Sequence, residues 1–277
     1  MTVRVVTDSA ADLTDELAAE LAVSVVPLTI RFGSEEFVDR QDLTPAEFYA
    51  RCAASPVLPE TAAPSPGAFE AAFRAAFDSG ADTVVCVNLS SGLSATMASA
   101  QNAARALDGH DVRIIDSRSV TWGLGSQVVA AAEAAAAGTS ADEIVALVED
   151  MVRRTRVYGT LDTLDNLKKG GRIGNAQALI GTLLSLKPII SVEGVVEEAG
   201  RARTRSKALK VLVERVAEAG EVEHVGVMHG SAPDIDQFVD LLTAVVPRER
   251  IHIGEIGATI GVHGGPRVMG VTFQVVS

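Results

Sequence analysis

Short runs of β-branched residues alternate with longer alanine- and leucine-rich stretches along the first half of this chain. The β-branched runs predict strands at residues 3–6, 23–30, 83–89 and 112–116. Between them, apolar residues recur at three- and four-residue spacing, which predicts helices. Alternating strands and helices are typical of a mostly parallel sheet with helices on its faces.

Several predicted helices carry start signals. Residues 44–45 and 65–66 are Thr-Pro and Ser-Pro pairs, as expected for a capping hydroxyl followed by a first-turn proline. Ser140 with Glu143 predicts a capping box.

The residue pattern changes near residues 153–158, where predicted short strands, glycines and basic clusters replace the alanine-rich helices. A chain of 277 residues also exceeds the usual size of one domain. We therefore predict an α/β protein of two domains. Residues 1–155 would form an N-terminal, mostly parallel sheet flanked by helices, and residues 156–277 a C-terminal mixed α/β domain.

The composition of the chain excludes several classes of binding partner. A formal net charge of −12 argues against nucleic acid and against adhesion to an anionic membrane. The sequence contains no run of about 18 uncharged apolar residues, so we expect no stable membrane insertion. Residues 1–10 do not resemble a signal peptide. Cys52 and Cys86 lie in apolar stretches without metal-site spacing, which favours buried thiols in a reducing compartment. We expect a cytoplasmic protein.

A polar loop follows the strand predicted at 83–89 and opens the next helix. It contains Ser90, Ser91, Gly92 and Ser94. In open α/β sheets the ligand crevice lies beyond the carboxyl ends of the strands, where helix N-termini favour anions. N-capping needs only one of these serines, so capping and anion binding both remain open.

We predict a loop between helices at residues 59–67, whose conformation the prolines restrict. Thr61 is an isolated hydroxyl in this loop and could bind a ligand or cap a helix. Residues 167–174 place Lys168, Lys169 and Arg172 around paired glycines, a local positive site that could bind phosphate or meet an acidic partner surface. The lysines are also typical of a helix C-terminus, with Gly170 as the left-handed residue that follows the helix. Capping of this kind leaves Arg172 unexplained.

Two later segments hold further candidates. Arg203 belongs to a basic cluster at residues 200–210, which could be either a solvated edge or a functional site. His263 falls in the glycine-rich stretch 257–270, which we predict to be a flexible loop.

Signatures of catalysis are missing from the sequence. It contains no P-loop, no G-x-S-x-G elbow and no histidine spacing typical of a metal site, and the G-x-G at residues 123–125 is a weak signal. We therefore predict a binding protein without catalytic residues, metal or cofactor. An acyl hydrolase using Ser91 and His263, or a small-anion binding protein, are the alternatives.

The motifs taken together resemble the DegV family, the acyl-binding subunits that serve bacterial fatty-acid kinase. The matching stretches, in chain order, are VTDSAADL, VVPLTIRFG, DLTPAEFY, PETAAPSP, LSSGLSATMASA, IDSRSVTWGLG, LDTLDNLKKGGRIG, GTLLSLKPII, RTRSKA and IGVHGGP.

This resemblance implies an apolar tunnel that encloses one long-chain fatty acid, with its carboxylate between the domains. Thr61 and Ser91 match the hydroxyls that bind the carboxylate. Arg172, Arg203 and His263 match positions tied to the carboxylate region and to work with the kinase. That kinase, a separate ATP-dependent subunit, would phosphorylate the carboxylate to acyl phosphate.

The sequence departs from the family pattern in two places. Ala62 and Ala63 replace a Ser-Gln pair after the loop threonine, and Arg267 replaces a glycine. The first change removes polar support beside Thr61, and the second is expected to add a charge near the mouth or to alter contact with the kinase.

Overall fold

The structure, a computed structural model, describes residues 1–55, 57–179 and 186–276, so residues 181–185 of the GTLLSLKPII motif lie outside it. The strands are β1 (Val3–Asp8), β2 (Ser24–Val26), β3 (Thr29–Phe32), β4 (Glu35–Val38), β5 (Glu60–Ala62), β6 (Thr83–Asn88), β7 (Asp111–Asp116), β8 (Thr155–Thr160), β9 (Lys187–Val192), β10 (Val196–Ala202), β11 (Val222–His229), β12 (Ile251–Glu255) and β13 (Met269–Val275). The α-helices are α1 (Asp15–Glu20), α2 (Pro45–Ala54), α3 (Pro66–Asp78), α4 (Thr96–Arg105), α5 (Trp122–Ala136), α6 (Ala141–Arg154), α7 (Asp165–Lys169), α8 (Arg205–Glu218), α9 (Ile235–Leu242) and α10 (Ala258–Gly264). Short 3-10 helices are η1 (Ser9–Ala11), η2 (Gly174–Leu179) and η3 (Arg248–Arg250).

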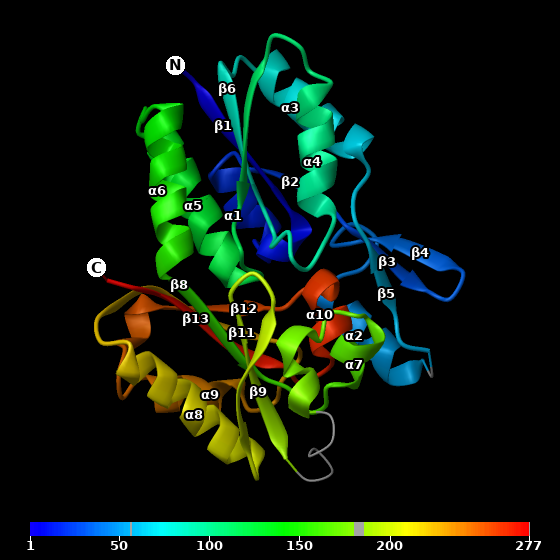
Figure 1. The fold of residues 1–277 in the computed structure, drawn as a ribbon, viewed down its shortest axis with the longest axis vertical. Helices are drawn as coiled ribbons and strands as arrows, with labels where there is room; N and C mark the ends of the chain where they lie inside the picture. The colour runs from blue at the N-terminus through cyan, green and yellow to red at the C-terminus, as the bar shows by residue number, and fades with distance from the viewer. Residues whose placement is uncertain (56, 180–185, 277) are drawn as a thin grey trace.

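A parallel sheet of order β2-β1-β6-β7 forms the centre of the N-terminal half. Helices α3 and α4 cover one face, and α5 and α6 cover the other (Figure 1). The predicted parallel sheet with flanking helices is therefore confirmed. The caps are confirmed as well, since Thr44, Ser65 and Ser140 each accept a hydrogen bond from a backbone N–H of the first helical turn.

The single strand predicted at residues 23–30 is wrong. The chain divides at Pro27, which has no N–H to donate to a continuing ladder. β2 joins the parallel sheet before this point, and β3 begins a separate antiparallel sheet of order β4-β3-β5 after it. The stretch predicted as a loop around Thr61 contains β5, in which Thr61 pairs with Ile30.

The C-terminal half is built on a mixed sheet of order β10-β9-β8-β13-β11-β12. Successive residues of a strand point to opposite faces, so each strand supplies two environments. Ile189 packs in the core beneath α8 and α9, whereas its neighbour Ile190 packs in the cluster shared with α5. Within the described ranges, no helix is long and apolar enough to cross a bilayer.

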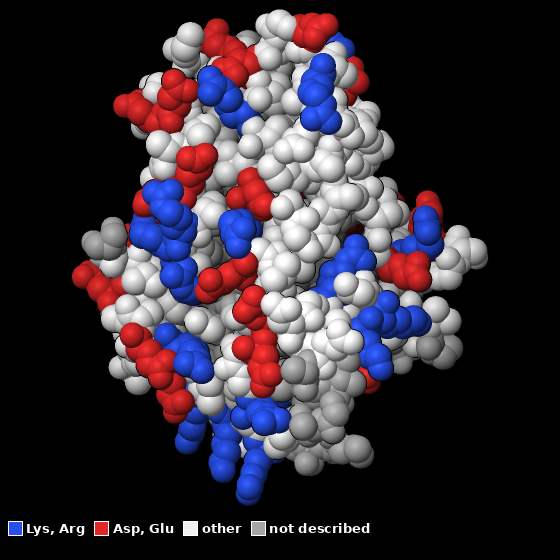
Figure 2. Space-filling view, viewed as in Figure 1, with Lys and Arg blue, Asp and Glu red and all other residues white. Residues whose placement is uncertain are grey.

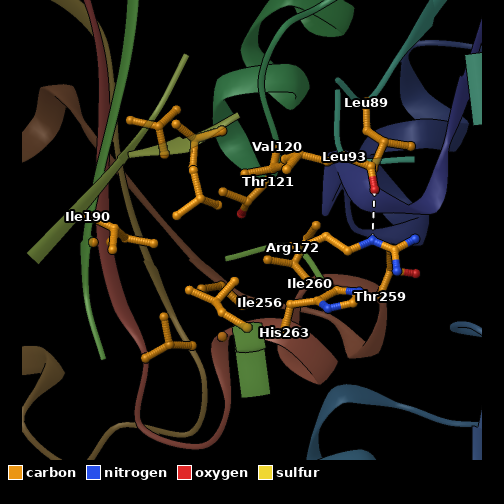
Figure 3. A pocket seen from close by; sticks show the side chains of 18 of the residues that line it. Leu89, Leu93, Val120, Thr121, Arg172, Ile190, Ile256, Thr259, Ile260 and His263 are labelled. Atoms are coloured by element: carbon orange, nitrogen blue, oxygen red, sulfur yellow. Dashed lines mark hydrogen bonds between the residues drawn. The ribbon is translucent and has the colours of Figure 1, made fainter. Parts of the chain in front are cut away.

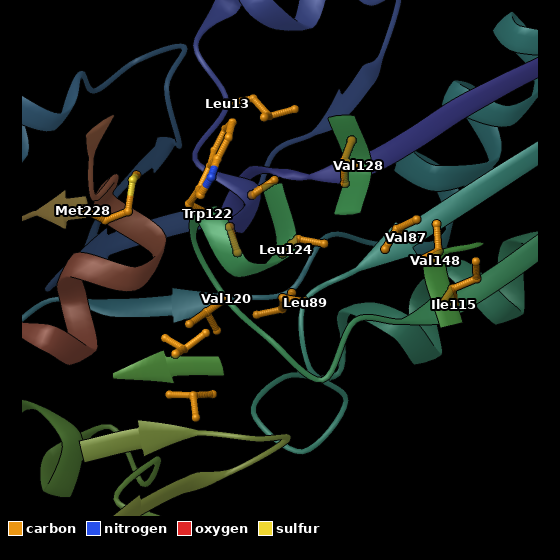
Figure 4. Close-up of a cluster of buried hydrophobic side chains, with 14 of the residues drawn as sticks. Leu13, Val87, Leu89, Ile115, Val120, Trp122, Leu124, Val128, Val148 and Met228 are labelled. Carbon is orange, nitrogen blue, oxygen red and sulfur yellow. The ribbon is translucent and has the colours of Figure 1, made fainter. Parts of the chain in front are cut away.

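Helix α5 lies between the two sheets (Figure 4). Trp122, Leu124 and Val128 join residues of both halves in one buried cluster. The ring of Trp122 lies over β11 at Gly226, where an added Cβ atom would overlap Cδ1 of the indole. Contact between the two halves at this point therefore requires a residue without a side chain.

Replacing Gly226 with alanine tests this contact. We expect Gly226→Ala to lower the free energy of unfolding by about 1–3 kcal/mol, because the added methyl must displace a packed indole ring. Gly67→Ala is the matched control, since a Cβ there meets nothing closer than 3.7 Å and the site is helical. Urea unfolding of both variants measures the effect, and equal stability of the two would contradict the assigned packing.

Candidate binding cavity

A mostly apolar cavity lies between the two halves of the molecule. It contains roughly 840 Å³ not filled by protein atoms, part of it open to solvent. Its aliphatic lining residues are Leu28, Leu89, Leu93, Val120, Val157, Leu161, Leu167, Ile190, Val192, Val196, Ile256, Ile260 and Val268. Arg172 and His263 lie together at one end of the cavity, and Ile190 lies at the other side (Figure 3).

Residues far apart in the sequence form the polar end of this cavity. Thr61 of β5 and His263 of α10 form a hydrogen bond between Oγ1 and Nε2, which are 3.1 Å apart. Arg172, from the turn after α7, lines the cavity beside them. A hydroxyl, an imidazole and a guanidinium thus converge where an aliphatic lining ends.

His263 lies in helix α10, so the flexible loop predicted for residues 257–270 is wrong at this point. The helix follows Gly257 as its N-cap and ends where Gly265 adopts a φ of 74°. Burial, and secondarily the charge of Arg172, lower the pKa of His263 from 6.5 to about 4. The imidazole is therefore neutral near pH 7, which leaves Arg172 as the cation at this end of the cavity.

The segment after α7 holds Arg172 in place. Its Nε donates to Leu93 O at 3.0 Å, drawn in Figure 3, and its Nη1 donates to Gly170 O at 2.6 Å. These bonds use two of five N–H groups, so others can still donate to an anion. The left-handed residue here is Gly171, with a φ of 68°, and the prediction for Gly170 is wrong.

Gly170 has a different role from the predicted one. A Cβ atom added at this position would lie 2.5 Å from Nδ1 of His263. The missing side chain lets α7 and α10 approach, which brings the guanidinium and the imidazole to one site. Gly170 is therefore needed for the close approach of α7 and α10, and not for a left-handed backbone conformation.

The serine loop is anchored by a buried carboxylate. Asp8, at the end of β1, accepts hydrogen bonds from Asn88 Nδ2 at 3.1 Å and from the Leu89 N–H at 2.9 Å. Burial raises the pKa of Asp8 to about 6, and these bonds partly oppose that rise. The carboxyl ends of β1 and β6 are thereby tied together, which fixes where the serine loop begins.

The four candidates in the serine loop occupy different environments. Ser94 lines the cavity, and its Oγ lies 2.8 Å from Thr96 Oγ1. Ser90 is buried; its hydroxyl donates to Gly194 O and accepts from the Gly92 N–H at 3.2 Å. The N-cap of α4 is Ala95, which makes no side-chain cap, but Ser94 Oγ accepts a hydrogen bond at 3.3 Å from the N–H of Thr96, the first residue of the helix. Ser94 therefore contacts the start of α4 as well as the cavity.

Gly92 and Ser91 lie on the side of the loop that meets neighbouring segments. A Cβ atom added to Gly92 would lie 2.5 Å from Gly194 O, so close backbone approach requires glycine there. Ser91 is exposed, and its Oγ and N–H both donate to the carboxylate of Asp116. Among the described residues it is not part of the cavity lining. Its role with a carboxylate ligand stays a prediction.

The remaining candidates lie farther from the cavity lining. Arg203 is exposed between β10 and α8. Arg267 is half exposed, and its Nε lies 3.4 Å from Oδ2 of Asp162. Ala62 is part of β5, where it pairs with Thr29. The geometry gives none of these residues a direct place at the polar end.

Sequence reasoning missed two polar residues of the lining, Thr121 and Thr259. The Thr259 hydroxyl donates to Asp39 Oδ2 at 2.5 Å, and the buried Thr121 hydroxyl has no hydrogen-bond partner among the described residues. Thr121 adopts a φ of 48°, unusual for a β-branched residue. Its only sequence signal is its place beside the G-x-G at residues 123–125.

A smaller polar hollow of about 560 Å³, part of it open to solvent, adjoins the same end of the cavity. It shares Thr61, Arg172 and His263 with the cavity and adds Lys169 and Asn166. The three shared side chains therefore separate an apolar compartment from a polar, solvent-connected one.

Comparison with known proteins shows which family this chain belongs to. A sequence profile of the family described as "Uncharacterised protein, DegV family" matches residues 2–275. A DegV domain-containing protein of Deinococcus radiodurans is 36% identical over 283 residues, which cover 100% of both chains. The chain belongs to the DegV family.

Solved structures of DegV family proteins share this fold over the whole chain. The structure of a Thermus thermophilus member, described by its fatty acid binding, has a TM-score of 0.92 and 33% identity, and the match covers 100% of both chains. A stearic acid-binding protein of Eubacterium ventriosum has a TM-score of 0.88 and 26% identity, over 99% of this chain and 98% of the other. The arrangement of the two halves is thus a family feature.

The pKa of His263 gives this DegV protein an expected pH dependence. Between pH 6.5 and 4 the unfolded chain binds a proton at this position that the folded chain does not, so stability falls on acidification. Between pH 6.5 and 5, in delipidated protein, we expect His263→Gln to lose about 1.5 kcal/mol less stability than the parent. Urea unfolding at both pH values measures this.

His110→Gln is the control, because His110 is exposed on the far side of the N-terminal sheet from the cavity. The rise in the pKa of Asp8 acts in the opposite direction and is common to all three proteins. Equal pH dependence of His263→Gln and the parent would show that the imidazole is not held neutral by the fold.

Proposed function

We propose that this protein binds one long-chain fatty acid in the cavity, with the carboxylate at the end formed by Thr61, Arg172, His263 and Ser94. The observation that carries the proposal is the juxtaposition of a mostly aliphatic compartment with the end at which Thr61, Arg172 and His263 converge. Thermus thermophilus and Eubacterium ventriosum relatives described as binding fatty acid or stearic acid support it.

The energetics of the two ends differ. Each methylene buried in the aliphatic compartment contributes about 0.8 kcal/mol, so a long chain gains affinity without polar contacts. A carboxylate loses hydration on entry and needs donors in compensation. Arg172 supplies unused N–H groups and a positive charge, and Thr61 supplies a hydroxyl. Neutral His263 can orient that hydroxyl without adding charge.

A small-anion binding protein or an acyl hydrolase fits these contacts less well. An anion site alone does not require an aliphatic lining that extends to Ile190. A hydrolase would pair Ser91 with His263, but Ser91 bonds to Asp116 and His263 bonds to Thr61. We therefore retain the lipid carrier as the proposal.

We further propose that the bound carboxylate is presented to a separate, ATP-dependent fatty-acid kinase subunit, which forms acyl phosphate. The polar hollow next to Arg172 and His263 supports this, because a phosphoryl group could approach the carboxylate from that side. Positioning and charge compensation would be the contribution of this chain. Free Cys52 and Cys86 are compatible with the reducing cytoplasm that such a role implies.

The affinity for fatty acids should depend on chain length. Up to the length that fills the cavity, each added methylene should tighten binding by at most about fourfold. Ile190→Trp should shorten the longest acid accepted, because the indole would occupy the cavity beside β9. Calorimetric titration of delipidated protein with a series of saturated acids, and native mass spectrometry of the purified protein, measure both effects.

Val245→Trp is the matched control, because Val245 is 41% exposed outside the cavity lining. It should bind the same acids as the parent. Affinity that is independent of chain length would favour the small-anion alternative, and ligand-free protein that ignores every acid would reject the proposal.

Arg172→Gln separates binding from presentation. We expect acyl phosphate formation by a purified bacterial fatty-acid kinase subunit and ATP to fall more than fatty-acid affinity, because burial of the chain is unchanged while the positive charge is lost. Arg203→Gln should lower kinase-dependent turnover with unchanged fatty-acid affinity if this exposed residue contacts the kinase. Equal losses of affinity and turnover in Arg172→Gln would contradict the division of roles.

A further inference from the structure

A second hollow, separate from the polar end of the cavity, lies where α6 ends, β8 begins and the β9–β10 turn approaches. It has about 450 Å³ of space outside protein atoms, part of it open to solvent. Arg118, Arg153, Arg156, Ser119 and Glu193 are among its lining residues, and we call it the arginine hollow. Basic side chains gather at the end of α6 near this turn (Figure 2).

The guanidinium groups are held in place but are not fully used. Arg118 Nη2 donates to Glu193 O at 3.0 Å, and Arg156 Nη1 donates at 2.9 Å to two carbonyls of its own segment. Arg153 Nη2 donates to Asp150 at 2.9 Å. Each guanidinium has five N–H groups, so each retains donors for a ligand.

The electrostatic balance of the arginine hollow contrasts with the rest of the chain. The three arginines have two carboxylate partners: Glu193, whose Oε1 lies 3.7 Å from Arg156 Nε, and Asp150, which is bonded to Arg153 and lies outside the lining. The whole protein has a formal net charge of −12. Cations concentrated in an acidic protein around a concave surface favour an anionic ligand.

The residues that line the arginine hollow also include a buried serine, whose Oγ lies against Gly123 of α5. Ser119 is 2% exposed, lines the arginine hollow, and its Oγ has no hydrogen-bond partner among the described residues. The neighbouring Ser117 hydroxyl is satisfied, because it donates to Ser119 O and accepts from the Ser119 N–H. A buried hydroxyl without a partner costs free energy unless a ligand or water satisfies it.

We propose that the arginine hollow binds phosphate or the phosphate group of a monoester. Guanidinium groups from three positions suit a tetrahedral oxyanion that carries about two charges. Val192 lines both this hollow and the cavity, so an anion bound here would contact the wall of the acyl compartment. The proposal does not depend on fatty-acid binding.

Calorimetric titration with inorganic phosphate tests the proposal in the full chain at low, matched ionic strength. We expect saturable binding at one site, weakened about tenfold or more in the Arg153→Gln, Arg156→Gln double variant. A double variant at two exposed arginines, Arg31→Gln, Arg74→Gln, is the charge-matched control and should bind as the parent. Circular dichroism checks the fold, and Arg153→Gln alone, at an exposed position, replaces the double variant if that variant does not fold.

Vesicles identify the source of the phosphate group. Phosphatidylcholine vesicles with and without phosphatidic acid are compared in a sedimentation assay. Binding of free phosphate supports a soluble ligand, and binding only to vesicles that contain phosphatidic acid supports a lipid headgroup. Either result agrees with the proposal if the double variant no longer binds the same probe. No binding of either probe, or equal binding by the parent and the variant, overturns it.

Discussion

Helix α5, packed between the two sheets, sets how the two halves of the molecule meet. Its first turns approach the neighbouring backbone closely, since a Cβ atom added to Gly125 would lie 2.6 Å from Ala11 O. Trp122 completes the contact by lying over Gly226 of the other half. The residues just before the helix, Val120 and Thr121, then reach the cavity. Apolar burial on both sides of one helix thus holds the halves in register around a shared space.

The chemistry of the cavity follows from which groups can remain charged when buried. His263 is neutral because burial and a neighbouring guanidinium both disfavour the imidazolium. Arg172 remains charged, and its bonds to Leu93 O and Gly170 O fix its position. A cation with free donors beside an uncharged hydroxyl and imidazole suits one carboxylate. Apolar walls beyond them suit the chain attached to it.

Sequence patterns correctly predict helix caps, which depend on hydrogen bonds between residues close together in the chain. Capping at Thr44 and Ser140 depends on residues three apart, so the structure confirms both signals. The errors at Gly170 and His263 arise where tertiary contacts choose among locally acceptable conformations. The break at Pro27 is different, because the missing N–H is itself a local signal. The serines show the same limit, because spacing alone could not separate a hydroxyl facing Asp116 from one facing the cavity.

Strand and helix periodicities and ordered motifs are local properties of the chain, so the parallel sheet, its helices and the family follow from the amino-acid order alone. Tertiary packing was needed to bring Thr61, Arg172 and His263 to one site, since they come from three separate segments. The same packing presents Ser94 to the cavity and Ser91 to Asp116. The physical reason is that side-chain direction and unfilled volume depend on how distant surfaces pack, which no local pattern records.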